Sequence, residues 1–433
     1  MMIKLNFIKK ILLIVFSSFV LIIFASFIYF DGNKFEIKEF FKKNLSPNKF
    51  AFFQVLLANK RSTNKLNNDY NSKFLPSTEL LNLEFDKIDL SNLLSDQITE
   101  VGYAKGYKKN VKASFYLEYY KKNLLFLSKD GRLFYNNYKD LISNVELKNI
   151  ENNLDLNSAL DIFINENVIF VSGIKKINEC SYIQIFKGEI NDLKKIDFTN
   201  IFKSKECMQL IQAGRMQKLF NSNSILVSTA ADILKNKDGI DPKPQNDNSI
   251  FGKTLAINLN DSTFNIFSKG HRNIIGLYSD NEIILATENG PKGGDEINKI
   301  IYGKNYGWPV ASYGQKYNFK GSNKSLDYKD SHLDIGFVEP IYSFLPSIGI
   351  SEIIKISNKF SEKWKNNFLV ASLNGHHIYR IRFDKNYSKI IYKEKIFIGE
   401  RIRDMIYLDD YKVILMTLEN SGSLGILKEQ VFK

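Results

Sequence analysis

The sequence predicts an all-β protein, a six-bladed β-propeller preceded by an N-terminal transmembrane helix. Three observations lead to this fold class: apolar strand-like runs that repeat along the chain, no long amphipathic helical pattern after residue 110, and one uncharged apolar segment near the N-terminus. The chain has 433 residues, of which 44% are apolar and 13% aromatic, so it can bury one or more cores and is not globally disordered.

The repeat is carried by six short apolar runs that end in Ser or Thr. They are LLFLS (124–128), VIFVS (168–172), SILVS (224–228), IILAT (283–287), FLVAS (368–372) and VILMT (413–417). Their last residues are spaced 44, 56, 59, 85 and 45 positions apart, and a four-stranded propeller blade takes about 40–50 residues. We therefore expect six blades over residues 80–433, with loops inserted in the longer intervals. An array of β-sandwich strands is the alternative.

Residues 11–30 form the apolar segment near the N-terminus. They carry no charge, and at about 1.5 Å per residue in a helix they match a bilayer core of about 30 Å. Lys4, Lys9 and Lys10 precede the segment, which is also the form of a secretory signal. We favour an uncleaved anchor over residues 1–31, because the segment is long and its exit offers a poor cleavage site. The lysine asymmetry predicts one pass through the cytoplasmic (inner) membrane, a polar stalk at 32–79 and the propeller in the periplasm.

The charge and cysteine counts exclude several classes of protein. Lysine plus arginine is 60 and aspartate plus glutamate is 47, but the lysines are scattered among acids, so we expect a solvated surface and no nucleic-acid binding. Two cysteines exclude a cysteine-rich scaffold and a four-cysteine zinc site, and four histidines leave little room for a histidine-built metal centre. Outside the cytoplasm Cys180 and Cys207 could form a disulfide; two unpaired thiols are the alternative.

Two loops have unusual chemistry. The strand IILAT leads into ENGPKGGDE (288–296), where Gly290 and Pro291 expose carbonyls and Asp295 and Glu296 add carboxylates. Mixed carbonyl and carboxylate oxygens suit a hard cation such as calcium, although a plain turn has the same composition. In GERIRDM (399–405), two arginines alternate, so in a strand they point to one face and can bind carboxylates; a pair of structural ion pairs is the alternative.

Together these segments resemble the soluble pyrroloquinoline-quinone (PQQ) dependent aldose sugar dehydrogenases, the glucose/sorbosone dehydrogenase family. The family pattern GHRN…G, then TEHGPxGGDExN…GxNYGWPxxSYG, is matched by GHRNIIG (270–276), TENGPKGGDEIN (287–298), GKNYGWP (303–309) and ASYG (311–314). The stretches AGRMQ, FGKTLAIN, EPIY, PSIGIS and GERIRD also recur. The resemblance covers residues 205–430 well and 110–205 faintly, and it implies a six-bladed propeller.

The resemblance implies roles for individual residues. It implies that PQQ is held by a set of cofactor-binding residues: Arg272, Asn273, Asn289, Gly290, Pro291, Arg401 and Arg403. It implies that the carbonyls of Gly290 and Pro291 ligate a calcium ion bound to PQQ, and that Glu296 and Tyr306 belong to a second, structural calcium site.

The chain departs from the family at the reacting centre. The family's general base is a histidine four residues before an arginine that is Arg215 here, and that position holds Ile211, which cannot accept a proton. The family's strand-end lysine is Asn374, and the aspartate that supports the base aligns with Asp232 or Ala231. We expect a PQQ- and calcium-dependent, sugar dehydrogenase-like protein of altered or low activity, with a small sugar or alcohol as substrate and an unidentified electron acceptor. The alternative is an inactive propeller that binds a ligand or a protein partner.

Overall fold

The computed structural model describes residues 80–90, 113–143, 146–209, 212–231, 242–291, 293–314, 328–329 and 331–430. The chain divides into two compact units, Met1–Leu57 and Ala58–Lys433, and every described residue belongs to the second. The predicted anchor (1–31) and stalk (32–79) lie outside the described residues, as do Ile211 and Asp232.

The predicted location needs a correction. Among the residues that the structure describes, no helix has the length and apolar character needed to cross a membrane. This finding contradicts the prediction of a single pass through the inner membrane with the propeller in the periplasm.

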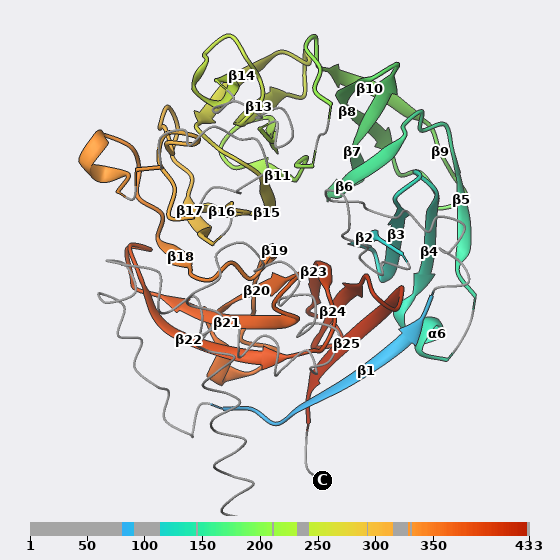
Figure 1. The fold of residues 1–433 in the computed structure, drawn as a ribbon. Coiled ribbons are helices and arrows are strands. Elements are labelled where there is room, and N and C mark those ends of the chain that lie inside the picture. Colours follow the sequence, from blue (N-terminus) through green and yellow to red (C-terminus); the bar gives the residue numbers. More distant parts are fainter. Residues whose placement is uncertain are drawn as a thin grey trace, which may run out of the picture. The chain divides into compact units, whose positions relative to one another are not determined.

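The described residues form six sheets around a central axis, which confirms the predicted six-bladed propeller (Figure 1). From the innermost strand outward, blade 1 contains β2 (Phe115–Tyr120), β3 (Asn123–Ser128), β4 (Leu133–Asn137), β5 (Lys148–Asn152) and β9 (Lys195–Ile196). Blade 2 contains β6 (Ser158–Asn165), β7 (Val168–Ile177), β8 (Cys180–Glu189) and β10 (Phe198–Lys203). Blade 3 contains β11 (Met216–Leu219), β12 (Ser224–Ser228), β13 (Lys253–Asn258) and β14 (Phe264–Lys269).

The other three blades have the same layout. Blade 4 contains β15 (Ile274–Ser279), β16 (Ile284–Glu288), β17 (Asp295–Lys299) and β18 (Tyr342–Phe344). Blade 5 contains β19 (Ile350–Lys355), β20 (Phe368–Ser372), β21 (His377–Phe383) and β22 (Ile390–Phe397). Blade 6 contains β23 (Ile402–Leu408), β24 (Val413–Leu418), β25 (Ser423–Glu429) and β1 (Leu83–Asp89). The helical pieces among the described residues are short: α6 (Tyr138–Ile142) and the 3-10 turns η2 (Lys243–Gln245), η3 (Leu333–Ile335) and η4 (Glu362–Trp364).

The six predicted runs all form the second strand of a blade, and their terminal hydroxyls explain the repeat. Ser172 at the end of this run in blade 2 donates a hydrogen bond to the carbonyl of Gly214, just before the innermost strand of blade 3. Ser228 in blade 3 donates in the same way to the carbonyl of Ile274 in blade 4. Because a buried carbonyl without a partner is costly, the repeated hydroxyl ties each of these blades to the next.

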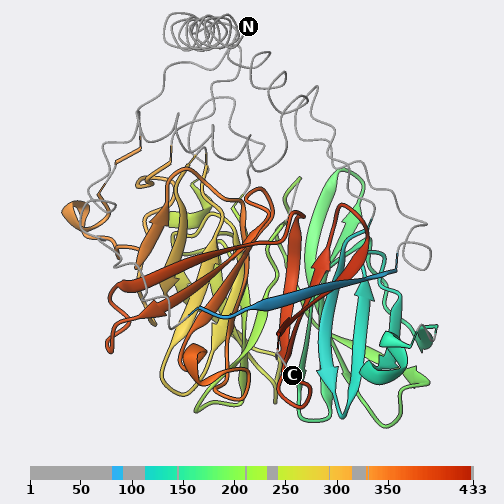
Figure 2. The same cartoon turned by 90° about the horizontal axis from the view of Figure 1, so that it is seen from below.

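The ring is closed by a strand from the N-terminal side. β1 pairs antiparallel with β25, with Leu83 opposite Glu429 and Asp89 opposite Ser423. Figures 1 and 2 show β1 in blue beside the red strands of blade 6. Blade 6 is therefore built from both ends of the described chain, which couples its sheet to the closure of the ring.

Hydrophobic clusters fill the interfaces between neighbouring blades. Leu127 of blade 1 and Val171 of blade 2 belong to one cluster, and Leu369 of blade 5 and Met416 of blade 6 belong to another. The remaining four interfaces each have a cluster of the same kind. Each blade thus buries both faces of its sheet, which accounts for the near-continuous apolar character of the second strands.

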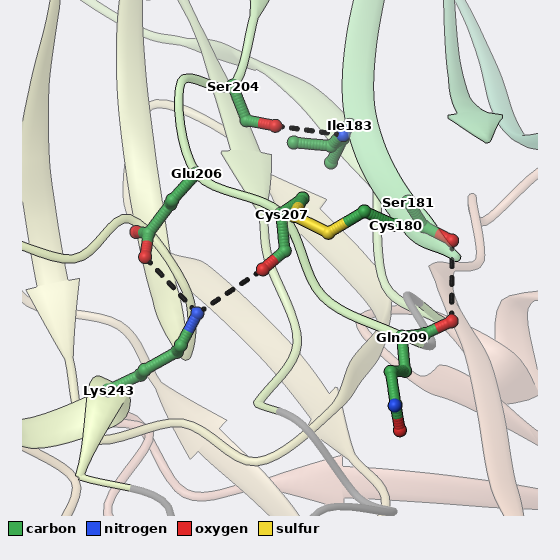
Figure 3. Close-up of a disulfide and its surroundings, with 8 residues drawn as sticks. All are labelled: Cys180, Ser181, Ile183, Ser204, Glu206, Cys207, Gln209 and Lys243. Atoms are coloured by element: carbon green, nitrogen blue, oxygen red, sulfur yellow. Dashed lines mark hydrogen bonds and ion pairs between the residues drawn. A yellow bond between two sulfur atoms is a disulfide. The ribbon is translucent and has the colours of Figure 1, made fainter. Parts of the chain in front are cut away.

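The two cysteines form a disulfide, so the predicted pairing is confirmed. Cys180 starts β8 and Cys207 follows β10, with their Cα atoms 5.6 Å apart. Figure 3 shows that the ammonium of Lys243 reaches both the carbonyl of Cys207, at 3.4 Å, and the carboxylate of Glu206, at 3.3 Å. The disulfide therefore fastens blade 2 to the segment that leads into blade 3.

Candidate functional site

Arg215 lies just before β11 and links all six blades. Its side chain is buried, at 7% exposed. Its partners come from the innermost strands of the other five blades: Tyr116, Asp161, Ile275, Glu352 and Asp404. From the sequence, Arg215 was used only to locate the position of the family's base, Ile211. Its contacts at the axis were not predicted.

Among the described residues, carboxylates outnumber cations around Arg215. Its Nη1 lies 2.8 Å from Asp161, 2.8 Å from Asp404 and 3.0 Å from Glu352, so one guanidinium faces three carboxylates. Burial raises the pKa of Asp161 to about 7, despite the opposing effect of Arg215, and burial also raises the pKa of Glu352. Asp161 and Glu352 are therefore easier to protonate than ordinary acids, which lessens the repulsion among the carboxylates around Arg215.

Arg401 and Arg403 share one buried carboxylate. Nε of Arg401 donates to Glu419 at 2.9 Å and Nε of Arg403 donates to the same carboxylate at 2.6 Å, as expected for two side chains on one face of a strand. Burial alone would raise the pKa of Glu419, but the two arginines outweigh burial and hold that pKa well below its usual range. Arg401 also donates to the side-chain oxygen of Asn374 at 3.0 Å. Two cations thus share one anion.

Arg272 and Asn273 stand immediately before β15. The guanidinium of Arg272 lies 5.4 Å from the ring centre of Trp308 and donates to the carbonyl of Asn289 at 2.5 Å. Its backbone N–H donates to Glu288. Asn273 donates to Gln212 at 3.2 Å, while its own side-chain oxygen is buried and accepts no hydrogen bond within the described part of the chain. This orphaned acceptor points to a donor that is not part of the described protein.

Glycines shape the loop between β16 and β17. A Cβ on Gly290 would lie 2.0 Å from the carbonyl oxygen of Gly294, so no larger residue fits there. The N–H of Gly290 donates to Asp295, whose other oxygen accepts from the backbones of Ile348 and Ile350. Both oxygens of Asp295 therefore accept backbone hydrogen bonds that hold the loop in place. Burial raises the pKa of Asp295.

The predicted site residues fall into two linked groups. One group lines a small cavity together with Glu288 and consists of Arg272, Gly290, Pro291, Glu296 and Tyr306. Asn273 and Asn289 flank these residues in the chain and are not among the walls of the cavity. The other group is Arg401 and Arg403 with Glu419. They are linked through blade 5, because Asn289 donates to the carbonyl of Ile350 at 3.2 Å and Arg401 donates to the carbonyl of Leu373 at 3.2 Å.

The metal-binding residues implied by the resemblance have protein partners. Pro291 accepts from the hydroxyl of Ser347, Glu296 accepts from Asn298 at 3.2 Å, and the hydroxyl of Tyr306 donates to the carbonyl of Lys299. Within the described residues no group of three or more His, Cys, Asp and Glu side chains is arranged to hold a metal ion. A calcium ion at this loop would depend on backbone carbonyls and on oxygens of a cofactor.

Comparisons of the sequence with known proteins identify the family of this chain. A sequence model described as Glucose / Sorbosone dehydrogenase matches residues 117–426. The quinoprotein glucose dehydrogenase B of Acinetobacter calcoaceticus is 28% identical over 234 residues, covering 40% of this chain and 49% of that protein. The aldose sugar dehydrogenase of Escherichia coli is 29% identical over 163 residues, covering 37% of this chain and 42% of that protein. The chain thus spans about half the length of the curated relatives it matches.

Solved structures agree on the fold. The soluble aldose sugar dehydrogenase of Escherichia coli, in its apo-form, superposes with a TM-score of 0.64 at 16% identity, covering 81% of this chain and 100% of that chain. The PQQ-bound aldose sugar dehydrogenase of Streptomyces coelicolor superposes with a TM-score of 0.54 at 15% identity, covering 81% of this chain and 100% of that chain. At these identities the likeness shows the fold, while the sequence match over 117–426 shows the family. This chain belongs to the glucose/sorbosone dehydrogenase family.

Proposed function

We propose that the protein is a PQQ-binding, sugar dehydrogenase-like propeller that oxidises an aldose or another small alcohol at a reduced rate. The observation that carries this proposal is the sharing of one buried carboxylate, Glu419, by Arg401 and Arg403. The surplus positive charge suits an anionic ligand, and PQQ carries three carboxylates.

The residues of both groups fit such a cofactor. Arg401 and Arg403 would hold its carboxylates, and Arg272 would meet its ring system beside Trp308. The unpaired oxygen of Asn273 would accept a hydrogen bond from it. Asn289 keeps Arg272 in place through its carbonyl. When bound, PQQ supplies a two-electron acceptor for hydride.

We also propose that calcium binds with PQQ at the carbonyls of Gly290 and Pro291. Both residues line the small cavity with Arg272 and Glu296, and a side chain at Gly290 would clash with the carbonyl of Gly294. Hard cations favour such oxygen ligands. A second calcium ion at Glu296 and Tyr306 is part of the same proposal, since burial beside Glu288 raises the pKa of Glu296 and a cation would relieve that cost.

The site lacks the family's proton acceptor. Ile211 replaces the base, and Gln212, the neighbour that bonds Asn273, is an amide and not a base. General-base catalysis contributes about 10²–10⁴ to rates of this kind, so the proposed turnover is slower by about that factor than with a histidine. The same substitution favours a second candidate function, an inactive propeller that binds a ligand without turnover.

The test is a titration of purified protein with PQQ in calcium and in chelator, followed by dye reduction with a panel of aldoses and alcohols. We expect binding in calcium, and slow dye reduction that rises in Ile211→His. The double variant Arg401→Ala with Arg403→Ala should bind PQQ more weakly, and Arg382→Ala on β21, away from the site, should not. Binding without dye reduction in either background would favour the inactive propeller, and no binding at tens of micromolar would end the cofactor proposal.

A further inference from the structure

One titratable side chain beside Arg401 and Arg403 has no role in the proposed function. Lys129 lies in the turn between β3 and β4 of blade 1, in the part of the chain where the family motifs are faint. The backbone of this turn is fixed, because the carbonyl of Lys129 accepts from the N–H of Ala159 at the start of blade 2, at 2.7 Å.

The strand register places Lys129 next to the shared carboxylate. β2 and β3 pair with Phe115 opposite Ser128, so Ser114 and Lys129 are the next residues along the two strands beyond this pair. The hydroxyl of Ser114 donates to Glu419 at 3.0 Å. Lys129 therefore stands at the edge of the cluster made by Glu419 and the two arginines.

The charges in this cluster do not balance. Glu419 already accepts hydrogen bonds from Arg401, Arg403 and Ser114. The ammonium of Lys129 makes no hydrogen bond or ion pair with the residues that the structure describes. Burial first, and then the repulsion of Arg403 and Arg401, lowers the pKa of Lys129 to about 8. Among the described residues, three cations thus surround the one carboxylate of Glu419, and an incoming carboxylate would relieve their repulsion.

We propose that Lys129 is the third cation of the cofactor cradle and contacts a carboxylate of bound PQQ together with Arg401 and Arg403. This inference rests on the proposed function. Asn374, which stands where the resemblance leads one to expect a lysine, supplies an acceptor to Arg401 and no charge. Lys129 brings the missing positive charge from a different blade.

The test compares PQQ affinity in the full-length wild-type protein, Lys129→Gln and Lys129→Arg, by absorbance titration in calcium. Lys122→Gln is the matched control, because Lys122 is an exposed lysine at the other end of β3. A charge-assisted hydrogen bond justifies an expected loss of about ten-fold or more in Lys129→Gln, with recovery in Lys129→Arg and no change in Lys122→Gln. The thermal midpoint of Lys129→Gln should be unchanged or higher, since an uncompensated cation is removed.

A pH series separates this role from a merely structural one. The charged groups facing Lys129 are Arg401, Arg403 and Glu419, with Asp130 and Arg132 on its own turn. Ordinary arginines and acids do not titrate between pH 8 and 10, so wild-type affinity should fall over that range while Lys129→Gln stays flat. Equal affinity of Lys129→Gln and wild type would overturn the proposal for Lys129 alone, provided that the Arg401→Ala, Arg403→Ala variant binds more weakly. No PQQ binding by the wild type would refute the proposed function and this inference with it.

Discussion

Replacing Arg215 by methionine should destabilise the propeller, and more so at pH 8 than at pH 5. The substitution removes the one guanidinium that faces Asp161, Glu352 and Asp404, and also its hydrogen bond to the carbonyl of Ile275 at 2.9 Å. Removing one partner of a buried ion pair costs about 3–5 kcal/mol, because the other partner keeps an uncompensated charge. We expect a loss of that size at pH 8.

The pH dependence follows from the raised pKa of the acids. The pKa of Asp161 rises from 3.8 to about 7 in the fold, so the folded state binds this proton more tightly than the unfolded state. Its stabilising effect is complete below about pH 4 and is lost as the pH rises through about 7. At pH 5, below the raised pKa of Asp161 and Glu352, these two acids are largely protonated and leave less charge for Arg215 to compensate. The loss in Arg215→Met should then shrink to that of its backbone hydrogen bonds, about 1–2 kcal/mol.

The assay is urea unfolding at pH 5 and pH 8, followed by the fluorescence of the buried Trp364. Glu352→Gln is the matched control, because it removes one surplus carboxylate and keeps Arg215; we expect it to be neutral or stabilising at pH 8. An equal loss for Arg215→Met at both pH values would refute the electrostatic account. A loss in Glu352→Gln as large as in Arg215→Met would show that all three carboxylates are needed in ionised form.

Three further perturbations test other parts of the structure. Cys207→Ser removes a disulfide across 27 residues and should lower the free energy of unfolding by about 3 kcal/mol, while wild type in reductant should show the same loss. The pKa of Glu419 is held below its usual value, so its ionised form should stabilise wild type above about pH 4.5, and this stabilisation should be lost as the pH falls. In Glu419→Gln, the free energy of unfolding should lack this dependence on pH in the acid range. Gly290→Ala should weaken PQQ binding in calcium, because its Cβ would meet Gly294. Gly303→Ala meets nothing within 4 Å but is strained by its φ of +72°, so it controls for a loss of stability without a clash in the loop; equal binding by both variants would contradict the role of the loop.

The blades could be predicted because strands of a buried sheet have a recognisable local sequence pattern. Strands that bury both faces read as short apolar runs, and the six runs found in the sequence are the six second strands. β1 could not be found in this way. Its sequence, LEFDKID, alternates apolar and charged residues on a half-exposed edge, and its partner β25 lies more than 300 residues away. Pairing over that distance has no signature in a local pattern.

The site was predictable where its residues are close together in the chain. Gly290, Pro291 and Glu296 of the GPKGGDE motif line one cavity with Arg272, while their roles in binding stay a prediction. The sequence did not predict the contacts of Arg215 at the axis or the position of Lys129 near Glu419, since both depend on contacts between blades. The membrane location was wrong: it rested on one apolar segment that lies outside the described residues, and no described helix is long and apolar enough to cross a membrane.

The distribution of charge along the axis separates a binding site from a structural ion pair. Around Arg215 one cation faces three carboxylates, and two of these acids have a raised pKa, so protonation relieves their repulsion without a ligand. Around Glu419 one carboxylate faces two arginines and Lys129, and arginine cannot release its charge near neutral pH. A fold that needed this pair only for stability would gain from a second acid or from the loss of one arginine. Among the described residues, fixed positive charge therefore exceeds negative charge around Glu419, which is the condition that the proposed binding of an anion requires.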